Sequence, residues 1–269
     1  MTDQPSAIPV VMTVSGLDPG GGAGIQADIE AIASMGCHAA PVVTALTVQD
    51  TKRLQRFVAT DSLLLVEQAR AVLEDMTVGA IKIGMVGSVA VAEVLHSLLV
   101  DYPDVPVVLD PVLAAGGGGE LAGDETIAAV KSLLLTQTTI LTPNSVEARA
   151  LAHEADTLDA CAQQLQNLGC EYVLITGAHE PTEQVVNVLY GNYRRLETFR
   201  WPRLPHSYHG SGCTLAAAIA GLLAQGREPF TAVHEAQEYA WETLRHGYRI
   251  GRGQMIPNRL FWARGTEEE

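Results

Sequence analysis

The sequence is poor in several features that mark particular protein classes. It has four cysteines in 269 residues, and none of them forms a CxxC pair, so neither a zinc site nor a disulfide framework is indicated. No apolar run approaches the roughly 20 residues that cross a bilayer, and the first fifteen residues lack the basic start of a secretory signal. We therefore expect a cytoplasmic protein that does not insert into a membrane.

Positive charge is also scarce. There are 17 lysines and arginines against 31 aspartates and glutamates, which gives a formal net charge of −14. A chain with this balance is a poor partner for nucleic acid or an anionic membrane, because both require a positive field. A small-molecule partner is expected instead.

What is present is a large apolar content, 47% of the residues, arranged in a regular alternation. Strand-like runs at residues 8–16, 40–48, 79–85, 105–112, 138–143 and 172–177 are separated by segments with helical spacing, among them 23–36, 61–76 and 89–102. This βαβ rhythm predicts a doubly wound α/β fold, with a mostly parallel sheet and helices on both faces.

The pattern changes after Gly177. Residues 185–191 and 192–201 are adjacent strand-like runs with turn residues between them, so they predict an antiparallel hairpin at one edge of the sheet. Helical patterns return at 211–226 and 229–247, and no linker or internal repeat interrupts the chain. We therefore expect residues 1–269 to form a single domain.

A glycine-rich segment, residues 15–24, connects the first predicted strand to the first predicted helix. It lies where ligands bind in parallel α/β sheets, at the carboxyl ends of the strands. It is not a Walker A loop, because no Gly-Lys-Ser/Thr follows, and its spacing does not match a dinucleotide fingerprint. A flexible surface turn is the alternative.

A second glycine segment, His209-Gly210-Ser211-Gly212-Cys213-Thr214, opens an apolar helix. Free backbone N–H groups and the positive end of the helix dipole at such a terminus favour a bound phosphate. We expect the same terminus to lower the pKa of the Cys213 thiol, so that Cys213 acts as a base. The alternative is that Cys213 packs as a small apolar residue, which is our interpretation of Cys37, Cys161 and Cys170.

Acidic and amide side chains follow two later strands. Asp110 ends one strand, and Asn144 with Glu147 stands where the next strand leads into a helix. These side chains could hold magnesium together with phosphate oxygens. Equally, Asn144 and Glu147 could form a helix capping box. Lys82 lies within a buried-looking strand and therefore needs an anionic partner.

Taken together, these segments resemble a known family. The motifs SGLDPGGGAGIQADIEA, VVTALTVQDT, KIGMVGS, VVLDPVL, ILTPNSVEA, ITGAH and HGSGCTLAAAIA follow one another in the order of the hydroxymethylpyrimidine and phosphomethylpyrimidine kinases of thiamine biosynthesis, which are ribokinase-like enzymes. The resemblance covers nearly the whole chain. It implies phosphorylation of 4-amino-5-hydroxymethyl-2-methylpyrimidine, and then of its monophosphate, with ATP and Mg²⁺.

The resemblance also implies roles for individual residues. Gly210, Gly212 and Cys213 would be catalytic, with Cys213 in the place of the usual aspartate base. The pyrimidine would be surrounded by Gly16, Asp28, Thr47, Gln49 and Met85. Nucleotide and metal would be held by Asn144, Thr176, Ser211, Asp110 and Glu147, and the run Gly116–Gly119 would belong to a flap over the site.

The chain departs from the family pattern at Thr176, where many relatives carry a lysine, so magnesium or an arginine would have to neutralise the phosphate there. Arg252 likewise replaces a lysine, which changes hydrogen-bonding geometry. A pyridoxal or pyridoxine kinase is an alternative function, since a hydroxymethyl-bearing nitrogen ring fits similar pocket chemistry. A catalytically silent ligand-binding relative is another. We also expect a homodimer.

Overall fold

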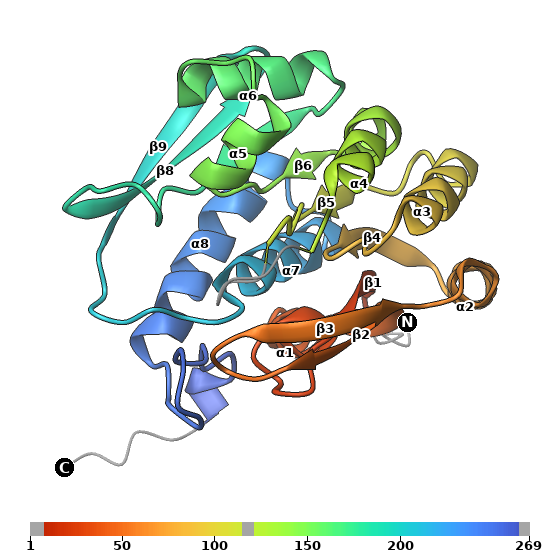
Figure 1. Cartoon of the computed structure of the whole chain (residues 1–269), viewed down its shortest axis with the longest axis horizontal. Coiled ribbons are helices and arrows are strands. Elements are labelled where there is room, and N and C mark those ends of the chain that lie inside the picture. Colours follow the sequence, from red (N-terminus) through yellow and green to blue (C-terminus); the bar gives the residue numbers. More distant parts are fainter. Residues whose placement is uncertain (1–7, 115–120, 264–269) are drawn as a thin grey trace, which may run out of the picture.

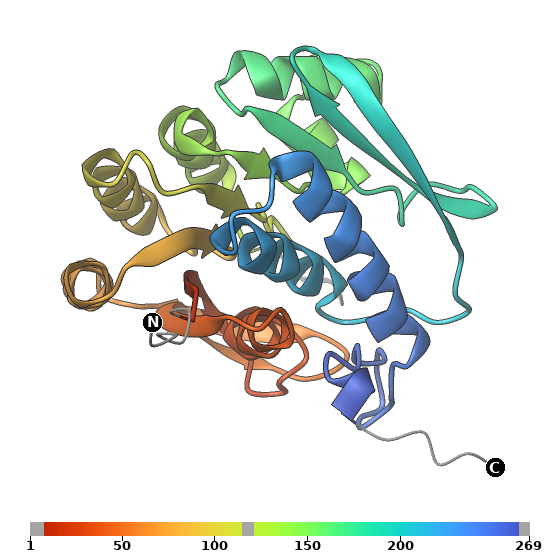
Figure 2. The same ribbon diagram turned by 180° about the vertical axis from the view of Figure 1, so that it is seen from behind.

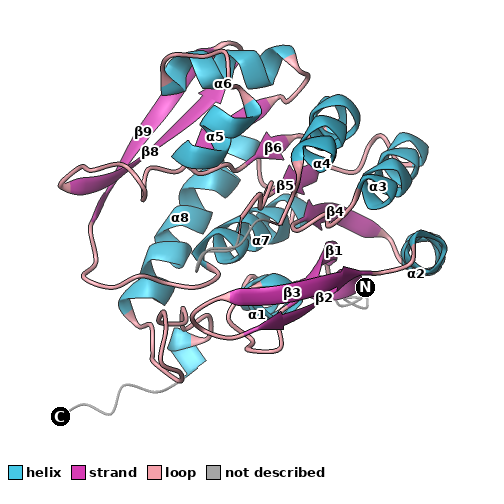
Figure 3. Ribbon diagram, in the orientation of Figure 1, coloured by secondary structure: helices cyan, strands magenta, loops and turns pink. Residues whose placement is uncertain are grey.

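The computed structural model describes residues 8–114 and 121–263, and its strands form one sheet (Figures 1 and 3). The strands are β1 (Val10–Leu17), β2 (His38–Gln49), β3 (Leu54–Ala59), β4 (Val78–Ile83), β5 (Val107–Leu109), β6 (Ile140–Leu141), β7 (Tyr172–Ile175), β8 (Gln184–Gly191) and β9 (Arg194–Pro202). They are ordered β3-β2-β1-β4-β5-β6-β7-β8-β9.

The central strands are parallel, as predicted. β2, β1, β4, β5, β6 and β7 pair in parallel, and β8 and β9 add the predicted antiparallel hairpin at one edge. The opposite edge carries an unpredicted antiparallel strand, β3, paired with β2. Its sequence, LQRFVA, mixes polar and apolar residues, and such a strand can form because an edge strand has one solvated side.

Helices cover both faces of the sheet. They are α1 (Gly24–Ser34), α2 (Ser62–Asp75), α3 (Val89–Asp101), α4 (Asp124–Ala129), α5 (Ser145–Leu151), α6 (Leu158–Asn167), α7 (Ser211–Ala224) and α8 (Pro229–Arg245). Short irregular helical turns follow α4, at Val130–Leu134 and Leu135–Gln137, and another lies at Phe261–Ala263. Helices α1, α7 and α8 lie on the face turned forward in Figure 2, and α2 to α6 lie on the other.

The side-chain alternation of the buried strands divides the core into two layers. In β5, Val107 and Leu109 pack with α2 to α6, whereas Val108 packs with α1, α7 and α8. Side chains of β4 and β7 also alternate between the two layers. Ile81 of β4 packs in the layer of α2 to α6, and Leu174 of β7 packs in the layer of α1, α7 and α8. A continuous apolar run is therefore needed in each central strand, because both of its faces are buried.

Two further expectations concerned membrane insertion and a flap over the site. None of the helices in the described ranges is both long and apolar enough to cross a membrane; the cellular location stays a prediction. The run Gly116–Gly119, predicted to belong to a flap, lies outside the described residues.

Candidate active site

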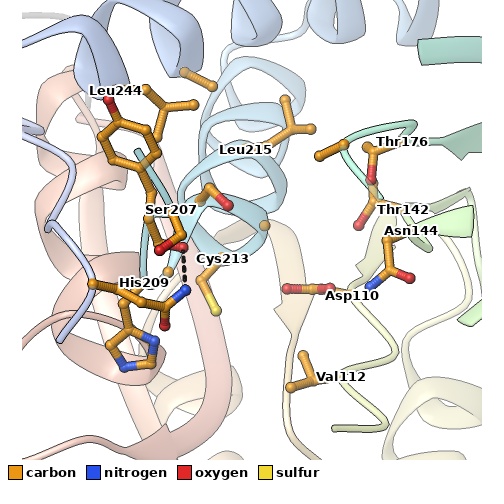
Figure 4. A pocket seen from close by; sticks show the side chains of 18 of the residues that line it. Asp110, Val112, Thr142, Asn144, Thr176, Ser207, His209, Cys213, Leu215 and Leu244 are labelled. Carbon is orange, nitrogen blue, oxygen red and sulfur yellow. Dashed lines mark hydrogen bonds between the residues drawn. The ribbon is translucent and has the colours of Figure 1, made fainter. Parts of the chain in front are cut away.

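A cavity of about 580 Å³ opens at the carboxyl ends of the parallel strands, where the glycine loop after β1 faces the start of α7 (Figure 4). All but one of the site residues expected from the sequence line it. Its lining includes Gly16, Thr47, Gln49, Met85, Asp110, Asn144, Glu147, Thr176, Gly210, Ser211, Gly212 and Cys213. The fold thus brings together residues that are up to two hundred positions apart in the chain.

The first turn of α7 forms part of one wall of this cavity. Gly210 precedes the helix in a left-handed conformation, with φ of 83°, which glycine adopts without strain. The N–H groups of the first helical turn have no partner inside the helix, and they carry the positive end of its dipole. A Cβ atom on Gly212 would lie 3.6 Å from Oδ2 of Asp110, so this turn and the acidic side of the cavity are close neighbours.

Cys213 is buried in that turn and lies between His209 and Asp110 in Figure 4. The expectation of a lowered thiol pKa is wrong: burial, together with the charges of Asp110 and Asp28, raises the pKa of Cys213 to about 12, although Lys82 acts in the opposite direction. Burial outweighs the helix terminus because a thiolate loses its hydration inside the protein. With a pKa of about 12, the thiol is neutral at pH 7.

Asp110 and Glu147 form the acidic side of the cavity. Burial raises the pKa of Asp110 to about 6, although the Lys82 ammonium acts in the opposite direction. Burial, followed by the charge of Asp110, raises the pKa of Glu147 to about 7. The two carboxylates therefore repel each other, and a cation between them would relieve that repulsion. Among the described residues, no group of three or more His, Cys, Asp and Glu side chains could hold a metal, so substrate or water oxygens would have to complete its shell.

Asn144 and Glu147 also form the capping box that was the alternative to a metal role. Oδ1 of Asn144 accepts hydrogen bonds from the N–H groups of Val146 and Glu147, and Oε2 of Glu147 accepts one from the Asn144 N–H at 3.0 Å. The other Glu147 oxygen accepts a hydrogen bond from the Leu113 N–H at 3.2 Å. The cap fixes the Glu147 carboxylate at the cavity wall, so the structural role does not prevent a functional one.

Gly16, Thr47, Gln49 and Met85 line the opposite wall. A Cβ atom on Gly16 would lie 2.9 Å from Sδ of Met85, which leaves room there for glycine alone. Thr47 donates its hydroxyl proton to the carbonyl of Leu17 at 2.8 Å. This wall combines an apolar surface with the amide of Gln49, a group that offers both a donor and an acceptor to a ring.

Asp28 is the predicted site residue that the structure places elsewhere. Its carboxylate is fully buried, accepts a hydrogen bond from Thr13 at 2.6 Å and forms an ion pair with Lys82 at 2.9 Å. Asp28 is absent from the cavity wall. The partner that Lys82 was expected to need is therefore Asp28, because an isolated buried charge of either sign would be too costly.

Thr176 lies at the end of β7, where its backbone bridges to Asn144. Arg203 also lines the cavity, and it donates hydrogen bonds to the carbonyl oxygens of Ala178, Glu180 and Thr182 at 2.8 to 3.0 Å. Its guanidinium organises the loop that follows β7.

Asp18 and His209 are polar residues of the cavity lining that were not predicted as site residues from the sequence. Nε2 of His209 lies 2.9 Å from Gln49 Nε2 and 2.9 Å from Asp18 Oδ2. Asp18 also accepts hydrogen bonds from the N–H groups of Gly20, Gly22 and Ala23. Burial alone would raise the pKa of Asp18, but His209 and the backbone hydrogen bonds leave it lowered. The local sequence Asp18-Pro19-Gly20 could have predicted the hydrogen bonds of Asp18 to the backbone of its own turn. It could not have predicted the contact with His209, which is 191 positions away in the chain.

An open α/β sheet whose cavity of small-molecule size is lined by a glycine-flanked helix terminus and two carboxylates has the architecture of the ribokinase-like small-molecule kinases. The comparison with known proteins identifies the branch. The chain belongs to the phosphomethylpyrimidine kinase family, whose model matches residues 18–258.

Two relatives that match along nearly their whole length are named hydroxymethylpyrimidine/phosphomethylpyrimidine kinases. The hydroxymethylpyrimidine/phosphomethylpyrimidine kinase of Synechococcus elongatus is 35% identical over 92% of this chain and 96% of its own length. That of Streptomyces coelicolor is 35% identical over 97% of both chains. A thiamine biosynthetic bifunctional enzyme of Arabidopsis thaliana is 34% identical over 95% of this chain. This chain spans about half of that enzyme's length, 51%.

Solved structures agree on the fold. The phosphomethylpyrimidine kinase of Clostridium difficile 630 superimposes with a TM-score of 0.76 at 31% identity and covers 88% of this chain and 99% of its own. An ADP complex of Bacillus subtilis pyridoxal kinase has a TM-score of 0.86 at 26% identity, with 96% and 99% covered. The fold is therefore shared by a phosphomethylpyrimidine kinase and a pyridoxal kinase.

Proposed function

We propose that this protein transfers the γ-phosphoryl group of ATP to the hydroxymethyl oxygen of 4-amino-5-hydroxymethyl-2-methylpyrimidine, and then phosphorylates the monophosphate, as part of thiamine biosynthesis. The observation that carries the proposal is the convergence of both glycine loops, Gln49 and the two carboxylates on one cavity in a chain that matches the family over residues 18–258. Phosphoryl transfer depends mainly on positioning and charge neutralisation, and this cavity supplies both.

The pyrimidine is expected to lie on the wall formed by Gly16, Thr47, Gln49 and Met85. The ring would lie against the surface where the Met85 thioether packs on Gly16, both of which line the cavity. The Gln49 amide can donate to a ring nitrogen and accept from the exocyclic amine. His209 contacts that amide and is itself in contact with Asp18, and both residues line the same cavity.

The transferring phosphoryl group is expected at the first turn of α7. The N–H groups there, from Ser211 to Cys213, point their donors at developing negative charge, which is the arrangement of an anion hole. Asp110 and Glu147 fit magnesium by their chemistry, since hard carboxylate oxygens together with phosphate oxygens are its usual ligands. Magnesium bound there would offset the phosphate charge and weaken the repulsion that Asp110 exerts on a Cys213 thiolate.

Cys213 is the proposed general base: as a thiolate in the loaded site, its Sγ would accept the proton of the hydroxymethyl group while that oxygen attacks the γ-phosphorus and ADP leaves. The Lys82 ammonium lowers the thiol pKa, while burial and Asp110 raise it. A base role therefore requires the charge of Asp110 to be neutralised in the loaded site. Thr176 and Asn144, which both line the cavity, are expected to face the nucleotide.

The test is ATP consumption measured in parallel with hydroxymethylpyrimidine, its monophosphate and pyridoxal, with and without Mg²⁺. We expect turnover of both pyrimidines that depends on the metal. Turnover of the first pyrimidine alone would restrict the proposal to one step. No turnover of any of the three would refute the kinase proposal and leave a catalytically silent ligand-binding relative.

A pyridoxal kinase is the second candidate, favoured by the TM-score of 0.86 to the Bacillus subtilis pyridoxal kinase. Pyridoxal shares with the pyrimidine a nitrogen ring, a methyl group and a hydroxymethyl arm. The higher sequence identity to the pyrimidine kinases, 35% against 26%, favours the first proposal. A larger kcat/KM for pyridoxal would reverse that order.

We also propose a single kinase domain spanning residues 1–269 and a homodimer formed through the β2–β3 edge. Leu17 and Leu46 are neighbours across β1 and β2, and Leu46 faces Val58 across β2 and β3. Their exposed fractions are 37%, 56% and 58%, so they form a row of apolar side chains on one face, of the kind that a second copy covers. Light scattering of the wild type and Leu46→Lys should show a dimer and a monomer, respectively.

A further inference from the structure

Arg259 is a charged residue buried near the active site without lining it. Its side chain is fully buried, and it lies in the segment after α8, far in sequence from both glycine loops. Nε donates to Thr214 Oγ1 at 2.8 Å, Nη1 donates to Glu30 Oε2 at 3.1 Å, and Nη2 donates to the carbonyl of Gly22. Each nitrogen therefore contacts a different element of the fold.

Two of these partners belong to the loops that form the cavity. Gly22 lies in the loop between β1 and α1, where the N–H of Gly24 forms a hydrogen bond with the Cys213 thiol. Thr214 lies in the first turn of α7, and its hydroxyl donates to the carbonyl of Gly210 at 2.8 Å. Arg259 thus connects the loop between β1 and α1 to the first turn of α7, although it does not itself line the cavity.

The packing between these groups leaves little freedom. A Cβ atom on Gly210 would overlap the carbonyl oxygen of Gly22 and would lie 2.9 Å from Nη2 of Arg259. The two loops are therefore in direct contact, and the guanidinium bonds to both sides of that contact. A planar fork of fixed geometry suits this role, whereas the single ammonium of a lysine could reach only part of the partner set.

We propose that Arg259 is a positioning residue for phosphoryl transfer: it fixes the spacing between the loop that carries the acceptor and the α7 turn that holds the phosphoryl group. The inference rests on the proposed kinase function. A displacement of about 1 Å between reacting groups can reduce a rate about 10²-fold, so loss of the guanidinium should lower kcat more than it changes KM.

The same segment offers a matched control for a merely structural role. The carbonyl oxygen of Arg259 accepts hydrogen bonds from Ser34 Oγ at 2.6 Å and from the Tyr239 hydroxyl at 2.9 Å. Tyr239→Phe therefore weakens the attachment of the segment while leaving the guanidinium contacts in place. If Arg259 only anchored the chain, this variant and Arg259→Lys would behave alike.

The experiment compares wild type, Arg259→Lys, Thr214→Val and Tyr239→Phe for thermal stability and for kcat and KM with hydroxymethylpyrimidine and ATP. We expect kcat per folded molecule to fall about 10²-fold in Arg259→Lys, less in Thr214→Val, and to stay at the wild-type level in Tyr239→Phe. Unchanged kcat in folded Arg259→Lys would overturn the proposal. If that variant does not fold, unchanged kcat in the nearly isosteric Thr214→Val would overturn it equally.

Calorimetric titration separates this inference from the proposed function. The ratio of ATP to ADP affinity reports how well the site holds the γ-phosphate, without requiring any turnover. We expect the ratio to fall in Arg259→Lys and to be retained in Tyr239→Phe. If the wild type phosphorylates none of the three acceptors, the proposed function is wrong, and an equal ratio in all variants would then refute the positioning role as well.

Discussion

Asp28 and Asp110 are both buried aspartates next to the central strands, yet their surroundings differ. Asp28 is paired with Lys82 and accepts a hydrogen bond from Thr13, so its charge is matched inside the protein. Asp110 faces the cavity beside Glu147, and burial raises the pKa values of both carboxyls. The difference teaches that a matched buried charge supports the fold, whereas an unmatched one at a cavity wall is suited to a cationic ligand.

Removing Lys82 should break the matched side of this comparison. Lys82→Met leaves the Asp28 carboxylate buried without its cation, and breaking a buried pair in this way costs about 3–5 kcal/mol. Chemical denaturation should show that loss in the free energy of unfolding. Lys131→Met removes a lysine outside the core and should cost far less; equal losses would show that the Asp28–Lys82 pair is not a special contributor to stability.

Cys213 lies between the two regions, under the opposing influence of Lys82 and Asp110. If Sγ is the base, Cys213→Ser should lower kcat about 10²- to 10⁴-fold, with little change in melting temperature. Steady-state kinetics and thermal melts test this. Cys161→Ser, in a fully buried core position, should instead lose stability and keep its kcat. A folded Cys213→Ser enzyme with wild-type kcat would contradict the base assignment and leave an anion hole acting alone.

Asp110→Asn removes charge from the unmatched side. We expect kcat to fall about 10²- to 10³-fold, the scale of losing one electrostatic contact to the transition state, and stability to be kept or increased because the cost of burying a charge disappears. Asp28→Asn should give the reverse, with lower stability and a smaller kinetic effect. The same result for both variants would remove the distinction between the two aspartates.

Gln49→Ala sharpens the comparison by testing a neutral polar group in the same cavity. The loss of its hydrogen bonds should weaken pyrimidine binding by about 1–3 kcal/mol while ATP binding stays nearly constant. Calorimetric titration with each ligand measures both. Gln55→Ala, on the exposed side of β3, should change neither. Equal losses for pyrimidine and ATP would place Gln49 in the scaffold instead of the pocket wall.

The last expected effect is a pH dependence of stability. The pKa values of Glu147 and Asp110 are raised from ordinary values of 4.5 and 3.8 to about 7 and about 6. Between about pH 4 and 7 the folded protein holds more protons than the unfolded chain, so the free energy of unfolding falls as pH rises through this window. Denaturation between pH 5 and 8 without metal or nucleotide should show the slope, and Glu147→Gln should flatten it. Exposed Glu183→Gln should not.

Much of the site could be predicted because its residues stand at the ends of recognisable strands. Asp110 follows an apolar strand directly, and Gly210 to Cys213 open an apolar helix, so the carboxyl edge of the sheet gathers them. The match of these motifs to one family extended that prediction to Gly16, Gln49 and Met85. Asp28 was misplaced because the motif containing it, on the helix after the glycine loop, carries no information about which way its side chain turns.

The sequence by itself determined the alternation of parallel strands with helices, the antiparallel hairpin, the two glycine loops and the family, since these depend on local periodicity and on contiguous motifs. Tertiary structure alone decided the pairing of Asp28 with Lys82, the contact of His209 with Gln49 and Asp18, and the reach of Arg259 into both loops. It also decided the high thiol pKa of Cys213. These properties depend on burial and on partners that are distant in the chain, and neither can be predicted from the local sequence.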